Sequence, residues 1–487
     1  MKIYKKLAGQ TIVYGMGTVI PRLLNYAILT FYYTRLFTVE QFGVITELYA
    51  YVTFLMVILT FGTETGFFKF SSGKSDDTVF STLVGFLFST STLFIFFILS
   101  TRNTISEILD YSGNVEFISM LGIIVGIDAF STIGFAKLRL EENGIKFSML
   151  KIINVLATIF FVLFFYEWLP HMIENSVFAL FIDLRSDVTY VLLSNLLASF
   201  LVLVLLLPEY FNIKFRFKIE LLREILLYSL PLLVSGLAGI INETLDRVLL
   251  RHLIKNGDEA IYALGIYGAN YKIAVLILIF IQMFRFAIEP FYFSYYENKD
   301  HKIIYAQIMR LFIAVLLILS MIIIFYIDFI KYFIDAKFHE GLRIVPVILV
   351  SYIFYGVFFN LSIWYKLTKR TIYAIFLTSV GAIITILINM LFVSRFSYMA
   401  SAYGHLFSYA FMMVLSYLVG RRYFKIDYKL KRIFEYVVVA LVIFAIQYLT
   451  NTINLRYILS GILIIGYGYY IIRREGLIKN SYFLKWK

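Results

Sequence analysis

The 487-residue chain contains no cysteine and only five histidines. Without cysteine it has no disulfides, no thiolate metal ligands and no cysteine nucleophile. The histidines are scattered and none has the spacing of a zinc hydrolase, so neither a metal site nor a catalytic site is predicted. Charge is scarce as well, because charged residues make up 15% of the chain, against about 25% in soluble proteins. These absences exclude a water-soluble enzyme of ordinary composition.

Apolar sequence is abundant instead. Hydrophobic residues make up 61% of the chain and the mean hydropathy is +0.83. A helix that crosses a bilayer needs about 20 mostly apolar residues, and runs of that length recur throughout. They are too continuous for the strands of a membrane barrel. We therefore predict an all-α polytopic membrane protein with about 14 transmembrane helices, at residues 11–36, 40–68, 79–100, 115–137, 147–168, 188–207, 225–250, 260–288, 303–327, 343–365, 371–393, 399–420, 433–450 and 455–472.

The distribution of Lys and Arg predicts an orientation. If the N-terminus lies inside, the segments on the inner side carry 29 of the 44 Lys and Arg residues and those on the outer side carry 11. Because positively charged segments stay in the cytoplasm, both termini are predicted to be cytoplasmic. Arg285 and Arg310, at inner span ends, fit the same rule. The net charge of +13 is then explained by topology and contact with anionic lipids, and no nucleic-acid partner is predicted.

The two halves of the chain share a pattern. Residues 42–45 (FGVI) and 64–68 (ETGFF) bound the second span, and residues 264–267 (LGIY) and 289–293 (EPFYF) bound the eighth. This similarity predicts two six-helix lobes related by a parallel repeat, a transporter architecture. The predicted organisation is an N-terminal lobe at 1–210, a cytoplasmic interfacial linker at 211–224, a C-terminal lobe at 225–425, and two extra helices with a basic cytoplasmic tail at 426–487.

The four Lys and Arg residues counted on neither side, Arg22, Lys151, Lys272 and Arg310, fall inside predicted spans, and two of them are candidates for a cavity. An ionisable residue there costs about 2.5–3.5 kcal/mol on insertion scales, so it usually faces a cavity or a partner. Arg22 lies near the centre of the first span, with Asn25 and Tyr26 on the same helical face. Either Arg22 forms an ion pair with a carboxylate such as Glu47, or it binds an anionic ligand in a central cavity. Lys272, deep in the eighth span, is a second candidate for that cavity.

Asp128 is the acid nearest the middle of a span. It either holds a proton or a sodium ion that couples transport, or pairs with Arg22 or Lys272. Lys151, near the start of the fifth span, is expected to reach the cytoplasmic surface, as lysine side chains near span ends do.

Other acidic residues are candidates for gating or for structural ion pairs. Glu243 and Arg247 have the spacing of a helix salt bridge, with Asp246 beside them. Three further acids lie nearer span ends, where a carboxylate reaches water and can close a gate; these are Glu47, Glu64 and Glu289.

Five short segments carry a family resemblance: residues 15–22 (GMGTVIPR), 33–43 (YTRLFTVEQFG), 59–70 (LTFGTETGFFKF), 242–247 (NETLDR) and 265–267 (GIY). With them the chain resembles the polysaccharide flippases (O-antigen or Wzx type) of the multidrug/oligosaccharidyl-lipid/polysaccharide (MOP) exporter superfamily. The similarity is close over the first two spans and their counterparts, and elsewhere it rests on hydropathy and the number of spans.

The resemblance implies a V-shaped bundle that works by alternating access, without ATP or another cofactor, on a proton or sodium gradient. Its implied substrate is an undecaprenyl-diphosphate-linked oligosaccharide, moved across the bacterial cytoplasmic (inner) membrane. A diphosphate is suited by fixed cations such as Arg22 and Lys272. Polysaccharide polymerases and glycosyltransferases are implied partners, and a monomer is expected.

Three alternatives remain open from the sequence. A multidrug/cation antiporter of the same superfamily would have 12 spans and an acidic cavity, and a lipid II flippase would carry more arginines in its first lobe. A membrane glycosyltransferase or polymerase would show a large catalytic loop outside the membrane, whereas the longest outer break is at 168–187. We therefore predict a transporter rather than an enzyme.

Overall fold

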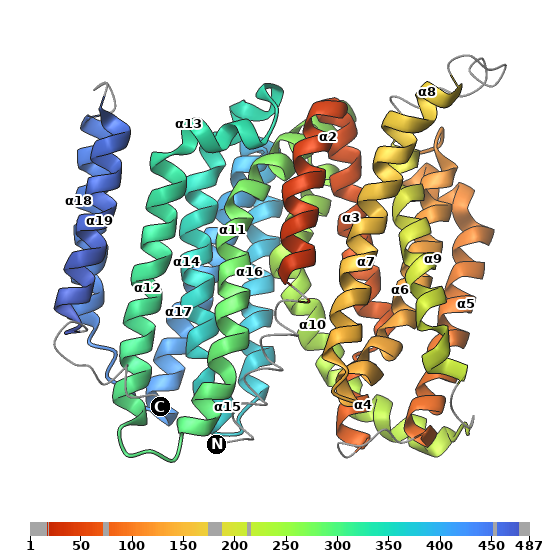
Figure 1. The fold of residues 1–487 in the computed structure, drawn as a ribbon, viewed down its shortest axis with the longest axis horizontal. Helices are drawn as coiled ribbons and strands as arrows, with labels where there is room; N and C mark the ends of the chain where they lie inside the picture. Colours follow the sequence, from red (N-terminus) through yellow and green to blue (C-terminus); the bar gives the residue numbers. More distant parts are fainter. Residues whose placement is uncertain are drawn as a thin grey trace. The chain divides into compact units, whose positions relative to one another are not determined.

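The computed structural model describes residues 17, 19–71, 77–173, 188–211, 216–450 and 455–476. Within these ranges the regular structure is helical and no strand occurs (Figure 1). The chain divides into two compact units, unit 1 formed by Met1–Gly268 with Val393–Ser397, and unit 2 formed by Ala269–Phe392 with Tyr398–Lys487. Helix α11 (Gly257–Tyr295) contributes to both units. The division into lobes of six helices and two further helices stays a prediction.

Twelve helices of the described ranges are long and apolar enough to cross a membrane, from Val39–Phe70 to Leu430–Leu449. The last predicted span coincides with a further helix, α19 (Arg456–Arg474). Of the first predicted span, residues 11–16 and 18 lie outside the described residues, and 19–36 is helical. Most of the predicted outer break at 168–187 also lies outside them. The prediction of an all-helical multi-pass membrane protein is confirmed, and 14 spans is an approximate count.

Unit 1 is a bundle of long helices that follow one another in the chain. The first helix covers residues 19–36 and includes a π-helical turn. The labelled elements of this unit are η1 (Asn25–Leu29), α2 (Thr30–Leu36), α3 (Val39–Thr60), α4 (Thr63–Phe70), α5 (Asp77–Ile108), α6 (Val115–Leu140), α7 (Gly144–Leu163), η2 (Phe164–Trp168), α8 (Leu169–Ile173), α9 (Thr189–Phe211), α10 (Ile219–Leu253) and the start of α11.

The second predicted span is interrupted rather than continuous. Helix α3 begins with a capping box, in which the Thr38 hydroxyl accepts from the Gln41 amide and the Gln41 side chain accepts from the Thr38 amide. It ends at Phe61 and Gly62, which take left-handed φ angles of 51° and 65°. A glycine adopts this conformation without a Cβ penalty, so the chain turns here and α4 begins at a new angle at Thr63.

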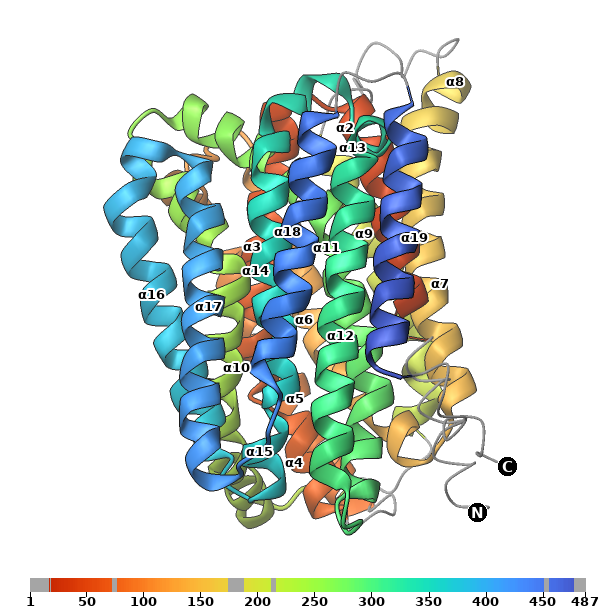
Figure 2. The ribbon, with the colours of Figure 1, turned by 90° about the vertical axis from the view of Figure 1, so that its left-hand side faces the viewer.

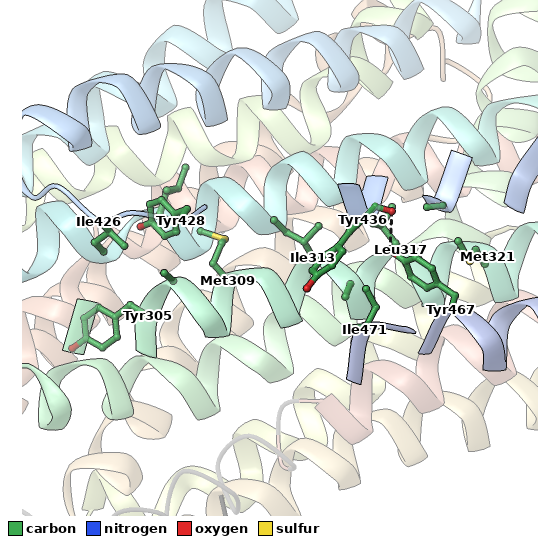
Figure 3. Close-up of a cluster of buried hydrophobic side chains, with 14 of the residues drawn as sticks. Tyr305, Met309, Ile313, Leu317, Met321, Ile426, Tyr428, Tyr436, Tyr467 and Ile471 are labelled. Carbon is green, nitrogen blue, oxygen red and sulfur yellow. Dashed lines mark hydrogen bonds between the residues drawn. The ribbon is translucent and has the colours of Figure 1, made fainter. Parts of the chain in front are cut away.

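Unit 2 begins within α11 and is also formed by helices. Its further elements are α12 (His301–Phe325), α13 (Ile327–Ile330), η4 (Lys331–Phe333), η5 (Ala336–Ile344), α14 (Val345–Leu361), α15 (Ile363–Leu367), α16 (Ile372–Phe396), α17 (Tyr398–Tyr423), α18 (Leu430–Leu449) and α19. Helices α18 and α19 lie side by side against α12 (Figure 2). Their contact forms an apolar core in which Tyr436 and Tyr467 pack among Ile313, Leu317 and Met321 (Figure 3).

A buried ion pair ties the end of α19 to this core. The Nε and Nη2 atoms of Arg310 donate to the two carboxylate oxygens of Glu475, each at 2.7 Å, and the Tyr436 hydroxyl donates to the same carboxylate at 2.6 Å. Only 1% of the Glu475 side chain and 6% of the Arg310 side chain are exposed. Arg310, expected from the sequence to serve as a topology signal at a span end, is therefore a structural cation.

Replacing Glu475 by glutamine is expected to lower the free energy of unfolding by about 1–3 kcal/mol at neutral pH, because Arg310 loses its counter-charge. Burial alone would raise the pKa of Glu475, but the hydrogen bonds from Arg310 and Tyr436 lower it below the ordinary 4.5. A carboxyl group whose pKa is lowered by folding stabilises the folded state at pH values above its ordinary pKa. This stabilisation is lost as the pH falls through the pKa of the folded state. Thermal unfolding in detergent should therefore show the two proteins converging below pH 4.5. A difference that persists there would contradict the ion-pair explanation.

Candidate functional site

The first helix packs against α7, and the two helices run in the same direction. A Cβ added at Gly17 would lie 2.1 Å from the Ser148 hydroxyl oxygen, so only glycine permits this approach. Further along both helices, the Tyr32 hydroxyl donates to the Glu167 carboxylate at 2.6 Å. We call the line of contact between the first helix and α7 the seam. Because the helices are parallel, side chains that lie equally far along them from the Gly17–Ser148 contact lie at similar depths on the seam.

Arg22 and Lys151 are two such side chains. Arg22 is five residues beyond Gly17 and Lys151 is three beyond Ser148, which places them about 7.5 and 4.5 Å along their helices. The two cations interact electrostatically. Arg22 is exposed, while Lys151 is half-buried with its Nζ 3.8 Å from the centre of the Phe135 ring. The expectation that Lys151 reaches the cytoplasmic surface stays a prediction; Phe135 lies five residues from the end of α6 that is predicted to be cytoplasmic.

Asp128 on α6 lies within electrostatic reach of Lys151 on α7. It also lies against Ser199 of α9 and within electrostatic reach of the Tyr49 hydroxyl on α3. That hydroxyl accepts a hydrogen bond from the Asn195 side chain at 2.9 Å. Asp128 and three neutral polar side chains, those of Tyr49, Asn195 and Ser199, thus lie near one another inside unit 1, with the Lys151 ammonium group within electrostatic reach. The role of Asp128 in ion coupling stays a prediction, with Lys151 within its electrostatic reach.

Helix α10 presents a second charged group to the first helix. Tyr26 lies within electrostatic reach of Glu243 and Arg247 as well as of Arg22. Arg247 donates from Nη1 to the main-chain oxygen of Glu243 at 2.7 Å and lies 3.7 Å from Asp246. Asp246 is fully buried and accepts a hydrogen bond from the Tyr267 hydroxyl at 2.5 Å.

Tyr26 of the predicted stripe therefore lies within electrostatic reach of two charged residues of α10. Asn25, the first residue of the π-helical turn, is exposed on the same helix. A π-turn inside a helix often accompanies a functional position. Arg22, Asn25 and Tyr26 stay predicted ligands of the substrate.

An apolar groove of about 330 Å³ follows the cations along the same seam. Its volume lies within the ~300–1,000 Å³ typical of ligand pockets. The lining comes from the first helix and α7, as Ala27, Ile28, Leu29, Phe31, Tyr32, Ile159, Val162 and Leu163. Ile28 and Phe31 are 39% and 45% exposed. One seam thus joins a pair of cations to an elongated apolar surface.

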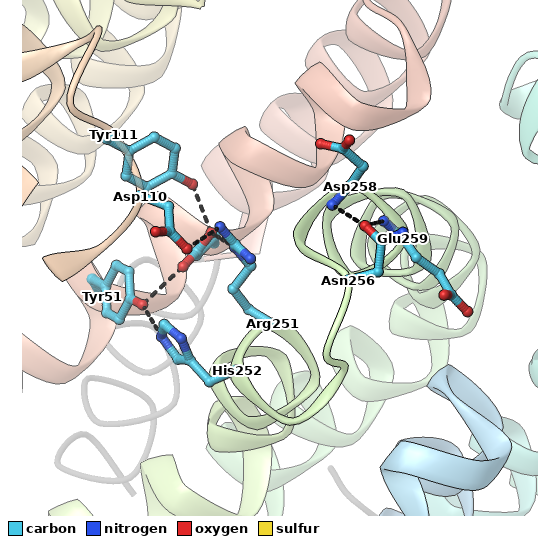
Figure 4. A network of polar contacts seen from close by, with 9 residues as sticks. Tyr51, Asp110, Tyr111, Arg251, His252, Asn256, Asp258 and Glu259 are labelled. Atoms are coloured by element: carbon cyan, nitrogen blue, oxygen red, sulfur yellow. Dashed lines mark hydrogen bonds and ion pairs between the residues drawn. The ribbon is translucent and has the colours of Figure 1, made fainter. Parts of the chain in front are cut away.

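Glu47 is fully buried in a polar network (Figure 4). Its Oε2 lies 3.3 Å from Nε of Arg251 on α10, and it accepts a hydrogen bond from the Tyr111 hydroxyl at 2.6 Å. Arg251 also contacts Asp110, in the turn between α5 and α6, at 3.2 Å. Burial and the adjacent Glu47 raise the pKa of Tyr111, so it stays a neutral hydrogen-bond donor. Glu47 is therefore paired with Arg251 rather than with Arg22, the partner considered from the sequence.

Tyr51 extends this network to a histidine. Its hydroxyl donates to Glu47 at 2.8 Å and lies 2.9 Å from Nε2 of His252. Because the hydroxyl has one proton and gives it to the carboxylate, Nε2 of His252 must be the donor in the second bond. The network therefore joins α3, α10 and the α5–α6 turn at the end of unit 1 that is predicted to face outward.

The other predicted gating acids also have basic partners. Glu64 forms an ion pair with Arg139 near the predicted cytoplasmic end of unit 1, with 44% and 43% of the side chains exposed. In unit 2, Glu289 pairs with Lys366, and Arg285 lies 3.4 Å from the same carboxylate. These pairs are compatible with gating, which stays a prediction for all three acids.

Lys272 lies in unit 2, in a helix segment with several polar neighbours. It is half-buried on α11. Next to it, the Asn270 side chain donates to the main-chain oxygen of Phe338 at 2.8 Å, and the Tyr271 ring packs against the rings of Tyr352 and His405. Arg22 belongs to unit 1, so a cavity shared by Arg22 and Lys272 stays a prediction.

Sequence reasoning missed Lys151 as a member of this site and Arg251 as the partner of Glu47. Lys151 lies only seven residues inside α7, which is compatible with snorkelling, and its electrostatic interactions with Asp128 and Arg22 depend on how the helices pack. A signal for Arg251 was present, since it follows Asp246 and Arg247 on one apolar helix. No cluster of three His, Asp or Glu residues that could hold a metal occurs in the part of the chain that the structure describes.

Comparisons with known proteins place this arrangement in a family. The profile of the family described as polysaccharide biosynthesis protein matches residues 7–296. No curated protein matches the sequence.

Several solved structures share the fold. The chain is similar to a lipid II flippase, MurJ, in an inward closed conformation, with a TM-score of 0.73, 13% identity, and coverage of 96% of this chain and 100% of that one. It is similar to an inward-facing multidrug resistance MATE family transporter of the MOP superfamily, with a TM-score of 0.63, 13% identity, and coverage of 85% of this chain and 97% of that one. It is also similar to a MOP superfamily transporter from Pyrococcus furiosus, with a TM-score of 0.57, 13% identity, and coverage of 86% of this chain and 95% of that one. These likenesses show the fold of MOP transporters.

Proposed function

Because the chain belongs to the polysaccharide biosynthesis protein family and has a MOP transporter fold, we propose that it is a flippase for a lipid-linked oligosaccharide. The proposed substrate is undecaprenyl diphosphate carrying a polysaccharide or O-antigen repeat unit. It moves from the cytoplasmic to the outer leaflet of the bacterial cytoplasmic membrane by alternating access, and an ion gradient drives the cycle. Both termini lie in the cytoplasm, and polymerases or glycosyltransferases act beside the protein.

The pair of cations on the seam between the first helix and α7 is the main support for this substrate. Arg22 and Lys151 lie at similar depths in unit 1, and Arg247 approaches the same helix from α10. Placing cations inside a membrane protein is costly, and an anionic ligand offsets that cost. A diphosphate accepts charge-assisted hydrogen bonds, which a guanidinium can make in pairs.

The apolar groove supports the lipid part of the substrate. Its side chains continue from the cations along one seam and are entirely apolar except for the Tyr32 hydroxyl, which is bonded to Glu167. A polyprenyl diphosphate has the same order of parts, a charged head followed by a long apolar chain. Burying apolar surface of such a chain stabilises the complex by about 25 cal/mol per Å² where it replaces water.

Ion pairs at the two ends of unit 1 provide contacts that can alternate. The Glu47–Arg251 network and the Glu64–Arg139 pair lie at ends predicted to face opposite sides of the membrane. We propose that they close opposite gates, that the Glu289–Lys366 pair acts in the same way in unit 2, and that Asp128 binds the coupling ion.

A lipid II flippase is the second candidate, favoured by the likeness to MurJ over almost the whole chain. A multidrug antiporter is less well supported, because Arg22 and Lys151 put two positive charges on the seam, Arg247 lies within electrostatic reach of the same helix, and these charges would repel an organic cation.

A reconstituted transport assay tests the proposal. Vesicles containing the purified full chain are loaded on one leaflet with undecaprenyl diphosphate linked to a radiolabelled N-acetylglucosamine, and an impermeant glycosyltransferase reports its arrival on the other leaflet. We expect ion-gradient-dependent transfer that protein-free vesicles lack. Transfer of lipid II alone would favour the second candidate. Transport of ethidium without transfer of either lipid would contradict the proposal.

A further inference from the structure

The buried Glu47 carboxylate is connected to an exposed histidine by two hydrogen bonds. Its Oε1 accepts from the Tyr51 hydroxyl at 2.8 Å, and that hydroxyl lies 2.9 Å from Nε2 of His252. Glu47 is fully buried, whereas His252 is exposed, one residue before the end of α10. An acid buried away from water is thus linked, through one tyrosine, to a side chain that water can reach (Figure 4).

Both hydrogen bonds point toward the carboxylate. Because an ionised carboxylate only accepts, the Tyr51 proton lies toward Glu47, and Nε2 of His252 donates to the Tyr51 oxygen. The Nδ1 atom of this neutral imidazole is then an acceptor, and imidazole exchanges protons near neutral pH. Each donor already faces the atom that would receive its hydrogen if a proton moved inward.

One guanidinium serves two carboxylates here. Arg251 lies 3.3 Å from Glu47 and 3.2 Å from Asp110. While His252 is neutral, these three side chains carry one net negative charge, and uptake of one proton brings the network to neutrality. The Asp110 side chain is 72% exposed and solvated, so the buried acid is the one whose charge depends on its protein neighbours.

Arg251 does not depend on Glu47 alone. Its Nη2 donates to Asp110, but in the described part of the chain its Nε makes no hydrogen bond, so its contact with Glu47 is electrostatic. The Tyr51 and Tyr111 hydroxyls supply the hydrogen bonds to that carboxylate. Protonation of Glu47 therefore removes an attraction between α3 and α10, breaks no hydrogen bond of Arg251, and leaves it Asp110 as a counter-charge.

Other charged side chains near this end of unit 1 do not change that balance. They are Glu40 on α3, Glu107 and Glu116 beside the α5–α6 turn, Asp246 and Arg247 one turn deeper on α10, and Lys255, Asp258 and Glu259 around the start of α11. Arg247 lies 3.7 Å from Asp246, so these two offset each other. The rest are exposed or half-buried, where water and salt screen them.

We infer from this arrangement that Glu47 is a proton-binding site, filled from the predicted outer side through His252 and Tyr51, and that its protonation loosens the contact between α3 and α10. A proton from water binds Nδ1 of His252. The Nε2 proton of that imidazolium passes to the Tyr51 oxygen, and Tyr51 gives its own proton to Oε1 of Glu47. His252 ends neutral with its hydrogen on Nδ1, both hydrogen bonds then point outward, and the carboxylate has lost its charge.

This inference rests on the proposed role of the Glu47–Arg251 network as a gate. Chains of acids and histidines carry protons in membrane pumps. Acid on the outer side would then favour opening of that end, so a proton gradient could drive release of the substrate there. The site is separate from Asp128 and requires no particular substrate.

Time-resolved infrared spectroscopy of the full chain in lipid nanodiscs tests the proton site. A carboxylic acid has a carbonyl band that its carboxylate lacks, so a pH drop through the ordinary histidine range, about 6.5, should produce this band in wild type. The part of the band that Glu47→Gln lacks belongs to Glu47. Tyr51→Phe and His252→Gln keep Glu47 but interrupt the route, so they should slow that part at least about tenfold.

Spin labels measure the loosening. The chain has no cysteine, so pairs of introduced cysteines can be labelled without background. Labels at Glu40→Cys and Lys255→Cys, both exposed, should move apart by at least about 1–2 Å as the pH falls, the size of known helix shifts. Labels at Ser112→Cys and Lys255→Cys should keep their distance, because Arg251 retains Asp110. With Glu47→Gln the first distance should be long at every pH.

Matched variants sharpen the test. Asp110 has a left-handed φ of 60°, which asparagine also adopts readily. Asp110→Asn leaves Glu47 as the counter-charge of Arg251, so the pH at which the labels separate should fall. Glu107→Gln removes an exposed acid beside the same turn and should behave as wild type does. Thermal unfolding and gel filtration confirm that each variant is folded.

Three results would overturn the inference. They are a carbonyl band that is unchanged in Glu47→Gln, a band that forms at the wild-type rate in both Tyr51→Phe and His252→Gln, and a label distance between α3 and α10 that does not respond to pH. These measurements contain no lipid-linked substrate. Their failure therefore leaves the proposed flippase function standing, and failure of the lipid transfer assay leaves the proton site standing.

Discussion

Replacing Arg22 by alanine is expected to reduce lipid-linked oligosaccharide transport by about 10–100-fold, because one or two charge-assisted hydrogen bonds to the diphosphate are lost. Arg22 is exposed on the first helix beside Lys151 and Tyr26, so it is accessible to a ligand. The radiolabelled-lipid transfer assay measures the rate, with the amount of folded protein in the vesicles held equal.

Two further substitutions in the first helix serve as comparisons for Arg22→Ala. Arg22→Lys keeps the charge but not the paired donors of a guanidinium, so it should fall between wild type and Arg22→Ala. Arg35→Ala removes an arginine near the other end of the helix, whose Nη1 donates to the Phe31 carbonyl at 2.8 Å, and it should transport normally. Wild-type transport by Arg22→Ala would remove Arg22 from the mechanism.

The largest effect on stability is expected for Arg251→Ala. Only 4% of its side chain is exposed, and it is the ion-pair partner of the fully buried Glu47. Removing one member of a buried pair leaves an uncompensated charge and typically costs about 3–5 kcal/mol. Denaturant unfolding of the purified protein, followed by tryptophan fluorescence, should show a loss of this size.

Matched variants distinguish a lost charge partner from lost packing. The double variant Glu47→Gln with Arg251→Gln leaves no buried charge and should recover a large part of the stability. Arg139→Ala breaks the half-exposed pair with Glu64 in the same unit and should cost no more than about 1 kcal/mol. An Arg251→Ala protein as stable as Arg139→Ala would show that the Glu47 carboxylate finds another partner.

Particular residues show which inferences a sequence supports. Arg22 and Asp128 stand out because each is an ionisable residue within an apolar run, and this can be seen without knowing the fold. Their partners cannot be seen in the same way. The electrostatic interactions of Lys151 with Asp128 and Arg22 depend on helix packing, and the partner of Glu47 in the structure is Arg251 rather than Arg22.

The break within the second span has a similar explanation. Leu59-Thr60-Phe61-Gly62 is apolar enough to continue a helix, and hydropathy does not register the left-handed backbone at Phe61 and Gly62. The turn depends on backbone conformation, to which a hydropathy window is insensitive. The glycine was visible, but glycine is also common in uninterrupted membrane helices.

Hydropathy and charge are properties of short segments, so an all-helical protein of about 14 spans with ionisable residues inside them could be predicted before the fold was known. Five short motifs also pointed to the family. Three features emerge only from the folded chain: Lys151 lies within electrostatic reach of Asp128 and Arg22, Arg251 neutralises Glu47, and an apolar groove lies between the first helix and α7. These features join segments far apart in the chain, and which side chains meet depends on how the helices are rotated and packed against one another.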